Sequence, residues 1–117
     1  MDVDLERLAE SIHGHLRRMF NSRQGHALTV PDYGLPDLTS FVRGSRESVS
    51  QLEEALRQCI ERYEPRLTDV VVSNVLSEED PFKMKFKITA RLVVGNRESG
   101  VWYETSIGPE GRVEVRG

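Results

Sequence analysis

The feature that most constrains this fold is the proline at position 65, which stands where the apolar pattern changes its period. Up to Tyr63 the apolar residues recur every three or four positions, as on one face of a helix. From Leu67 onward they alternate with polar residues, as in a half-buried strand. Proline lacks a backbone donor and disfavours helical geometry in the preceding residue, so we expect a helix to end at Glu64. Helices therefore come first and a sheet follows.

Two amphipathic helices are predicted before this proline. The first runs from about Val3 to Phe20, and we expect it to stop by Gly25, which lies at or just past its C-terminal cap. Its apolar stripe consists of Leu5, Leu8, Ile12, Leu16 and Met19. The second helix begins near residues 45–48, where Ser48 and Gln51 have capping-box spacing. Its apolar face consists of Val49, Leu52, Leu56, Cys59, Ile60 and Tyr63.

The second half of the chain reads as four strands separated by short turns. The predicted strands are Leu67–Leu76, Phe82–Val94, Val101–Ile107 and Arg112–Arg116, with an acidic turn at Ser77–Pro81. Short turns favour a simple meander, which leaves two edges with unpaired backbone groups, such as the N–H of Val113. We therefore predict an α+β fold, a single domain over residues 1–117 with two main helices packed on a small antiparallel sheet.

The segment between the helices has no clear period but is too apolar for a mobile linker. It runs from His26 to Asp37 and carries Leu28, Val30, Tyr33 and Leu35 among its prolines and glycines. Long irregular segments in compact domains are usually packed in place or functional. It therefore either seals one end of the core or forms a partner surface that includes Tyr33 and Gly34. A short helical turn, capped by Asp37 and ended by Gly44, follows it.

Composition and motifs exclude several functional classes. The formal net charge of −3 argues against a general nucleic-acid binder. No apolar run reaches the ~20 residues that span a bilayer, and the acidic N-terminus is unlike a signal peptide. Cys59 is the only cysteine, so no intramolecular disulfide forms and a buried thiol in a reducing cytoplasm is expected. His13 and His15 are two positions apart and point to opposite sides of a helix, which argues against a shared metal ion.

No catalytic motif stands out, and we predict no enzyme and no cofactor. The sequence lacks a glycine-rich phosphate loop, a nucleophile elbow and a cysteine–histidine pair with family spacing. A hydrolase-like carboxylate pair could combine Glu64 with Asp69 or Asp80. Such a pair needs a cleft and two differently tuned pKa values, and the sequence indicates neither.

Two charged features are candidates for contact with other proteins. Glu64 and Arg66 flank Pro65 at the point where the chain changes direction, which suits either a docking contact or a local helix cap. Lysines alternate along the strongest strand at Lys83, Lys85 and Lys87. They form either a solvated face that discourages aggregation or a basic face for an acidic partner.

Three motifs carry a family resemblance. Asn21–Gly25 (NSRQG), Pro31–Leu38 (PDYGLPDL) and Tyr63–Leu67 (YEPRL) occur in the order, and between the elements, typical of the baseplate subunits called TssE in bacterial type VI secretion systems. These subunits belong to the wider family of contractile-tail baseplate wedge proteins. The chain resembles this family over almost its whole length. Ser22 is a departure, because threonine is common there.

The resemblance implies a structural role in contractile injection. It implies a cytoplasmic baseplate docked at the inner membrane, wedge partners of the TssF, TssG and TssK type, and sheath partners of the TssB and TssC type. Glu64, Pro65 and Arg66 are then expected to contact the wedge core, and the sheet is expected to help start sheath assembly. The alternatives are a baseplate protein of a phage tail or an extracellular contractile particle and, from another class, a peptidoglycan hydrolase.

Overall fold

The fold consists of two helices followed by a four-stranded sheet. A computed structural model describes residues 3–25, 33–38, 45–76 and 83–117. The elements in chain order are α1 (Val3–Phe20), α2 (Arg46–Tyr63), β1 (Leu67–Val75), β2 (Met84–Val94), β3 (Arg97–Ile107) and β4 (Val113–Arg116). The strands form one antiparallel sheet in the order β1-β2-β3-β4. The predicted α+β class and the meander are both confirmed.

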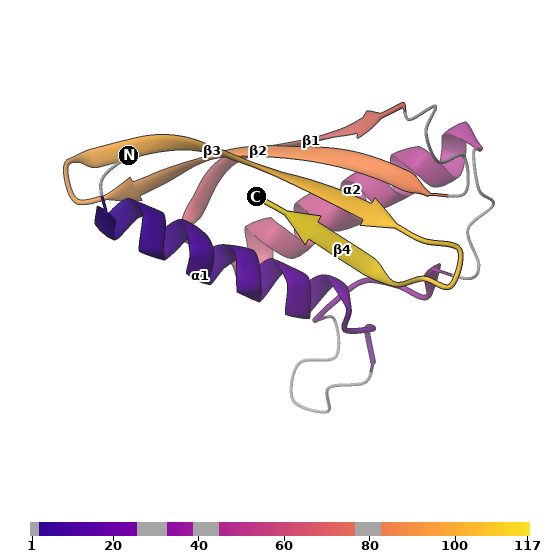
Figure 1. Cartoon of the computed structure of the whole chain (residues 1–117). Helices are drawn as coiled ribbons and strands as arrows, with labels where there is room; N and C mark the ends of the chain where they lie inside the picture. The colour runs from indigo at the N-terminus through magenta and orange to yellow at the C-terminus, as the bar shows by residue number, and fades with distance from the viewer. Residues whose placement is uncertain (1–2, 26–32, 39–44, 77–82) are drawn as a thin grey trace.

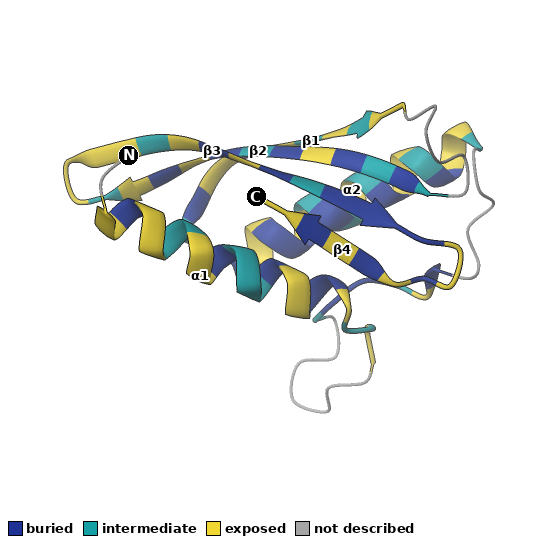
Figure 2. Cartoon of the chain, viewed as in Figure 1, coloured by how far each residue is buried: buried dark blue, intermediate teal, exposed yellow. Residues whose placement is uncertain are grey.

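Both helices cover the same face of the sheet. Helix α1 packs mainly along β4, and α2 packs along β1, and neither described helix lies on the other face (Figure 1). Buried and exposed residues alternate along β4, as they do on most of β2 (Figure 2). The fully buried side chains at the centre of the core come from both layers and include Ile12, Leu16, Phe20, Leu52, Leu56, Ile60, Phe86 and Ile88.

Three boundary predictions need correction, and others fall outside the described residues. Helix α2 is capped by Ser45, whose side chain accepts the Ser48 N–H at 3.0 Å, so Ser48 is not the cap. Gly25 lies five residues beyond the end of α1. Strand β3 begins at Arg97, earlier than predicted, because its polar first residues pair with the end of β2. Phe82, the acidic turn and residues 39–44 of the short helical turn lie outside the described residues.

The described part of the inter-helix segment seals one end of the core. Leu35 exchanges backbone hydrogen bonds with Ser22 and Gln24, both at 2.9 Å, and is fully buried. Gly34 has a φ of +99°, and a Cβ there would lie 2.3 Å from the Ser22 carbonyl oxygen, so only glycine fits. The buried thiol of Cys59 donates to the Gly34 carbonyl at 2.9 Å. These contacts favour the covering interpretation for residues 33–38.

Candidate functional site

The proline corner is built around a buried carboxylate. Glu64 caps the C-terminal end of α2, its N–H donates to the Ile60 carbonyl at 2.8 Å, and its side chain is 1% exposed. Two residues later, the Arg66 side chain folds back onto Glu64, and its Nε and one terminal nitrogen donate to the two carboxylate oxygens at 2.6 and 2.7 Å. Pro65 stands between them and fixes the turn. The result is a two-pronged ion pair that joins the end of α2 to the start of β1.

Helix α1 and the inter-helix segment complete this cluster. His15 Nδ1 lies 2.7 Å from a Glu64 oxygen, and because a carboxylate only accepts, the imidazole donates there. Its other ring nitrogen lies 3.3 Å from the Tyr33 hydroxyl. Arg66 also donates to the Ser11 hydroxyl at 3.2 Å. We call Ser11, His15, Tyr33, Glu64 and Arg66 the corner cluster; it ties four segments of the chain together.

The electrostatics of the cluster keep Glu64 ionised. Burial raises the pKa of the Glu64 carboxyl, but hydrogen bonds from Arg66 and His15, together with their charges, outweigh burial and leave that pKa below its ordinary value. The hydrogen bond to Glu64 correspondingly raises the pKa of Arg66, against a smaller opposing effect of burial. Glu64 is therefore a poor proton donor near neutral pH.

Only some of the residues predicted to contact a partner are exposed at this corner. Pro65 is exposed, and the Arg66 side chain keeps 37% of its surface accessible. Glu64 and Gly34 are buried within the domain, and Tyr33 is half-buried with its ring edge against Tyr63, 5.2 Å between centroids. The geometry thus combines the two interpretations of this triplet: Glu64 is an internal cap, and Pro65 and Arg66 form the accessible surface.

The three predicted lysines lie on, or just before, the side of β2 that faces away from α1 and α2. Lys87 is exposed, whereas Lys83 and Lys85 are half-buried. Across the ladder Lys87 stands opposite Glu104, and Lys85 stands opposite Ser106. Because Glu104 in turn pairs with Arg116, the rows of this face carry both signs of charge. The face is mixed rather than uniformly basic.

The outer edge of β4 is not open, contrary to the expectation for Val113. The Asn21 side-chain amide accepts the Val113 N–H at 3.0 Å and donates to the Val113 carbonyl at 2.8 Å. Two residues on, His13 Nε2 donates to the Val115 carbonyl at 2.5 Å. Side chains of α1 therefore occupy the backbone positions that a further strand would use.

The opposite edge, β1, is also partly protected. Glu53 of α2 accepts the Asn74 N–H at 2.8 Å. The ladder shifts register between Thr68 and Val71, around Asp69, whose φ of +52° is left-handed. Such a bulge bends an edge strand away from a flat template.

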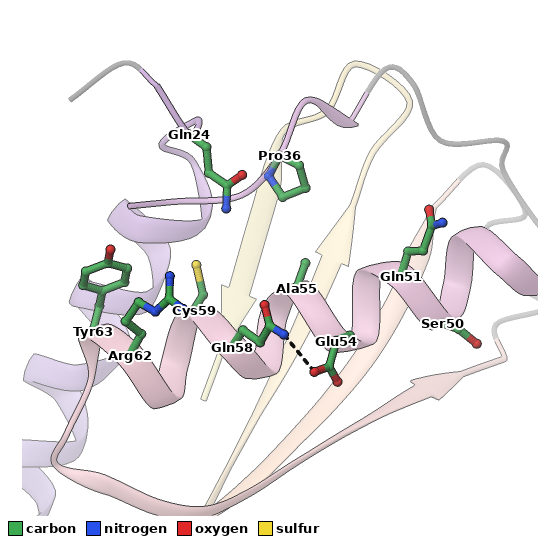
Figure 3. Close-up of a pocket in the computed structure, with 10 residues that line it drawn as sticks. All are labelled: Gln24, Pro36, Ser50, Gln51, Glu54, Ala55, Gln58, Cys59, Arg62 and Tyr63. Carbon is green, nitrogen blue, oxygen red and sulfur yellow. Dashed lines mark hydrogen bonds between the residues drawn. The ribbon is translucent and has the colours of Figure 1, made fainter. Parts of the chain in front are cut away.

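A groove of about 430 Å³ runs along one side of α2, and Gln24 and Pro36 also line it (Figure 3). Its walls are mostly glutamines and small apolar groups, and its carboxylate, Glu54, is held by Gln58 at 3.0 Å and by Arg57.

The carboxylate pair considered above is not assembled: Glu64 is enclosed, Asp69 is 69% exposed beside Arg91, and Asp80 lies outside the described residues. Within the described ranges, no group of three histidine, cysteine or acidic residues could hold a metal ion. None of the helices described is long and apolar enough to cross a membrane.

Sequence reasoning missed the partners that give these sites their shape. The sequence raises only a metal-ligand role for His15, although its place beside the apolar stripe of α1 indicates contact with the core. Asn21 was assigned only to the helix stop. Its contact with Val113 joins residues 92 positions apart, which leaves no local pattern to detect.

Comparisons with known proteins give a family match and two structural matches. A family model described as baseplate wedge protein gp25 matches residues 6–97. A chain of the baseplate complex from the type VI secretion system superposes with a TM-score of 0.69 at 22% identity, covering 86% of this chain and 94% of that one. A Geobacter sulfurreducens protein provisionally named a tail lysozyme superposes with a TM-score of 0.59 at 20% identity, covering 83% and 88%. No curated protein matches the sequence significantly.

Proposed function

The chain belongs to the baseplate wedge protein gp25 family, and we propose that it is a structural baseplate subunit of a type VI secretion system. In this role it links wedge subunits of the TssF, TssG and TssK type. It also helps to start a sheath of TssB- and TssC-type subunits. The baseplate would lie in the cytoplasm, docked at the inner membrane. The stretches Asn21–Gly25 and Tyr33–Asp37 support this subfamily over a phage tail. Neighbouring genes would separate it from a phage tail or an extracellular contractile particle.

The observation that carries the proposal is the rigid corner. The corner cluster joins both helices, the sheet and the inter-helix segment, so the accessible atoms of Pro65 and Arg66 are held in a fixed position. Of the five N–H donors of the Arg66 side chain, two are directed at Glu64 and one at Ser11, and 37% of the side-chain surface stays accessible to a partner. A preorganised, partly exposed arginine is a typical interface anchor, because little side-chain entropy is lost on docking.

The geometry does not favour the hydrolase alternative. A glycosidase needs an acid with a raised pKa facing a second carboxylate across a cleft. Glu64 has a lowered pKa and faces Arg66 and His15 inside the domain. We therefore expect purified protein to release no soluble fragments from peptidoglycan, and turnover that a single carboxylate substitution abolishes would contradict the structural role.

The assembly test compares two arginines of equal exposure. Arg66 is 37% exposed and Arg57 is 36% exposed, and each is paired with glutamate. Co-expression with wedge subunits should show that Arg66→Ala, and less completely Arg66→Lys, reduces co-purification while Arg57→Ala does not. The lysine variant is included because it keeps the charge but loses the planar fork. Equal recovery of all variants, each checked for folding, would exclude the corner as the wedge contact.

A further inference from the structure

Four arginine side chains gather along the seam between α1 and β4. They come from the last turn of α1, from β4 and from the residue just before β4: Arg17, Arg18, Arg112 and Arg116. Together with Asn21 and Glu114 they line a groove of about 580 Å³. Figure 1 shows the two elements side by side, although they are far apart in the sequence. The groove is therefore a product of the fold, and no local sequence pattern predicts it.

Hydrogen bonds across the seam hold the backbones that carry these arginines in a fixed relation. The Asn21 side-chain amide donates to the Arg17 carbonyl at 2.7 Å and to the Val113 carbonyl at 2.8 Å. Just beyond α1, the Arg23 guanidinium donates to the Gly111 carbonyl at 2.5 Å. Because both walls are already joined, the backbone needs no ordering when a ligand binds, which favours affinity.

The charges of this groove are not balanced from within the part of the chain that the structure describes. All four arginines are exposed, and their guanidinium groups have no hydrogen-bond or ion-pair partner among the described residues. Elsewhere Arg57, Arg66 and Arg91 each hold a carboxylate. The carboxylate that lines the groove, Glu114, forms no ion pair with its arginine neighbours. The groove is thus a concentrated positive site.

Two ordinary explanations account for only part of this arrangement. Cations in the last turn of a helix are favoured by its dipole, which suits Arg17 and Arg18. Arg116 stands opposite Glu104 across the ladder, although no ion pair joins them. Neither explains Arg112, nor why positive charges converge in a chain with 19 acidic and 16 basic residues. Like charges in one groove repel one another, and an anion from outside the chain relieves that repulsion.

The chemistry of the groove selects carboxylates carried by a short protein segment. Each guanidinium is a planar fork that matches the two oxygens of a carboxylate. Main-chain pairing at this edge is blocked by Asn21 and His13, so recognition depends on side chains. A long nucleic acid fits less well, because its phosphates would run past Glu114 and over a chain of net charge −3.

We propose that this surface, which we call the β4 arginine groove, binds a segment of a partner protein that is rich in aspartate and glutamate. Arg112 and Arg116 stand roughly 13 Å apart along the strand, which is the spacing of carboxylates four residues apart in an extended segment. The groove is distinct from the corner cluster, since Arg17 is turned roughly 200° around α1 from His15. The inference therefore goes beyond the proposed wedge contact and adds a second partner surface.

The test measures how the purified chain binds a fluorescein-labelled octapeptide of alternating glutamate and serine, by fluorescence anisotropy at about 0.1 M salt. The double variant Arg17→Gln with Arg112→Gln should bind at least about tenfold more weakly than the wild type. The matched control is Arg7→Gln with Arg46→Gln, which removes the same charge from exposed positions outside the groove. Its affinity should change by less than about twofold, because distant charges are largely screened at that salt. Circular dichroism checks that each variant is folded.

A variant of opposite sign sharpens the test. Glu114→Gln removes the carboxylate that stands among the arginines, so it should tighten peptide binding by about two- to threefold. Glu10→Gln removes the same charge from an exposed position of α1 outside the groove, and it should leave the affinity unchanged. A peptide with glutamine in place of glutamate should not bind. Equal affinities of the two glutamate variants would contradict the proposal.

The remaining outcomes separate the proposal from its competitors. No anisotropy change up to a millimolar concentration of the chain, or equal loss of binding in both double variants, overturns it. An octamer of deoxythymidine that binds more tightly than the peptide would identify a nucleic acid as the occupant and overturn it. So would a dimer of the free chain that the groove variant dissociates, which would identify a second copy. The assay contains no baseplate subunit, so its failure leaves the assembly test of the proposed function independent.

Nuclear magnetic resonance locates the bound peptide and shows how it is held. The side-chain Nε–H signals of Arg17 and Arg112 should shift on binding, whereas that of Arg57, which is paired on α2, should stay in place. The Val113 amide donates to Asn21, so its hydrogen exchange should be equally slow with and without the peptide. Faster exchange at Val113 on binding, or shifts confined to arginines outside the groove, would overturn the proposal.

Discussion

Replacement of Glu64 by alanine is the sharpest test of the corner cluster. Three side-chain nitrogens and one backbone N–H lie within 3.3 Å of its carboxylate, and that carboxylate is 1% exposed. Removing one partner of a buried ion pair typically costs about 3–5 kcal/mol, largely because the other charge is stranded. Here the Arg66 and His15 side chains keep 37% and 21% of their surface accessible, so water still solvates part of the charge that loses its partner.

We therefore expect Glu64→Ala to lower the free energy of unfolding by about 3 kcal/mol, the low end of that range. With an unfolding entropy of about 2.1 cal/mol/K per residue, this corresponds to a fall in Tm of roughly 12 °C for the 117-residue chain. Thermal and urea unfolding followed by circular dichroism measure both quantities. The expectation replaces the simpler one that Glu64 acts only by contacting a partner.

The control is Glu61→Ala, three residues earlier on the same helix. Glu61 is 48% exposed and pairs with Arg57 on the surface, where an ion pair contributes little to stability. Its Tm should stay close to that of the wild type. If Glu64→Ala also melts within about 2 °C of wild type, less than the shift expected for 1 kcal/mol, the cluster is not a structural element and the argument for a rigid corner is wrong.

Two further predictions concern pH and the β4 edge. The pKa of Glu64 is lower in the folded chain than in the unfolded one, so the stability that its ionised carboxylate contributes is complete above the unfolded pKa of about 4.3 and is lost as pH falls through the folded pKa. The free energy of unfolding should therefore fall less steeply with acid in Glu64→Ala than in the wild type. Parallel curves for the two proteins would contradict this. Asn21→Ala should lower the free energy of unfolding by about 1–2 kcal/mol and accelerate amide exchange at Val113, because both hydrogen bonds between the Asn21 side chain and Val113 disappear. Unchanged exchange at Val113 would show that water replaces the Asn21 amide without loss of protection.

Local patterns predicted the elements because local physics determines them. The three-to-four spacing from Leu5 to Met19 makes a stripe that only a helix can bury on one side, and α1 has the predicted bounds. Alternation along β2 likewise requires a sheet with one covered face. Pro65 predicted the boundary between the two, since its ring prevents the helix from continuing.

The site needed the structure because its contacts are long-range. Glu64 meets His15 across 49 positions, and Asn21 meets Val113 across 92. Nothing in the neighbourhood of Glu64 distinguishes a solvated acid at a helix end from a buried one. The extent of β3 was missed for a related reason: its first residues are polar, and they are strand because β2 offers them a partner in register.

Hydrogen-bond accounting argues against strand addition at the outer edge of β4. A segment that approached β4 would first displace the two bonds of Asn21 and the bond of His13, each worth about 1 kcal/mol net, so its own bonds would mostly replace existing ones. A proline at Val113 would accordingly loosen β4 from α1 without blocking an acceptor site.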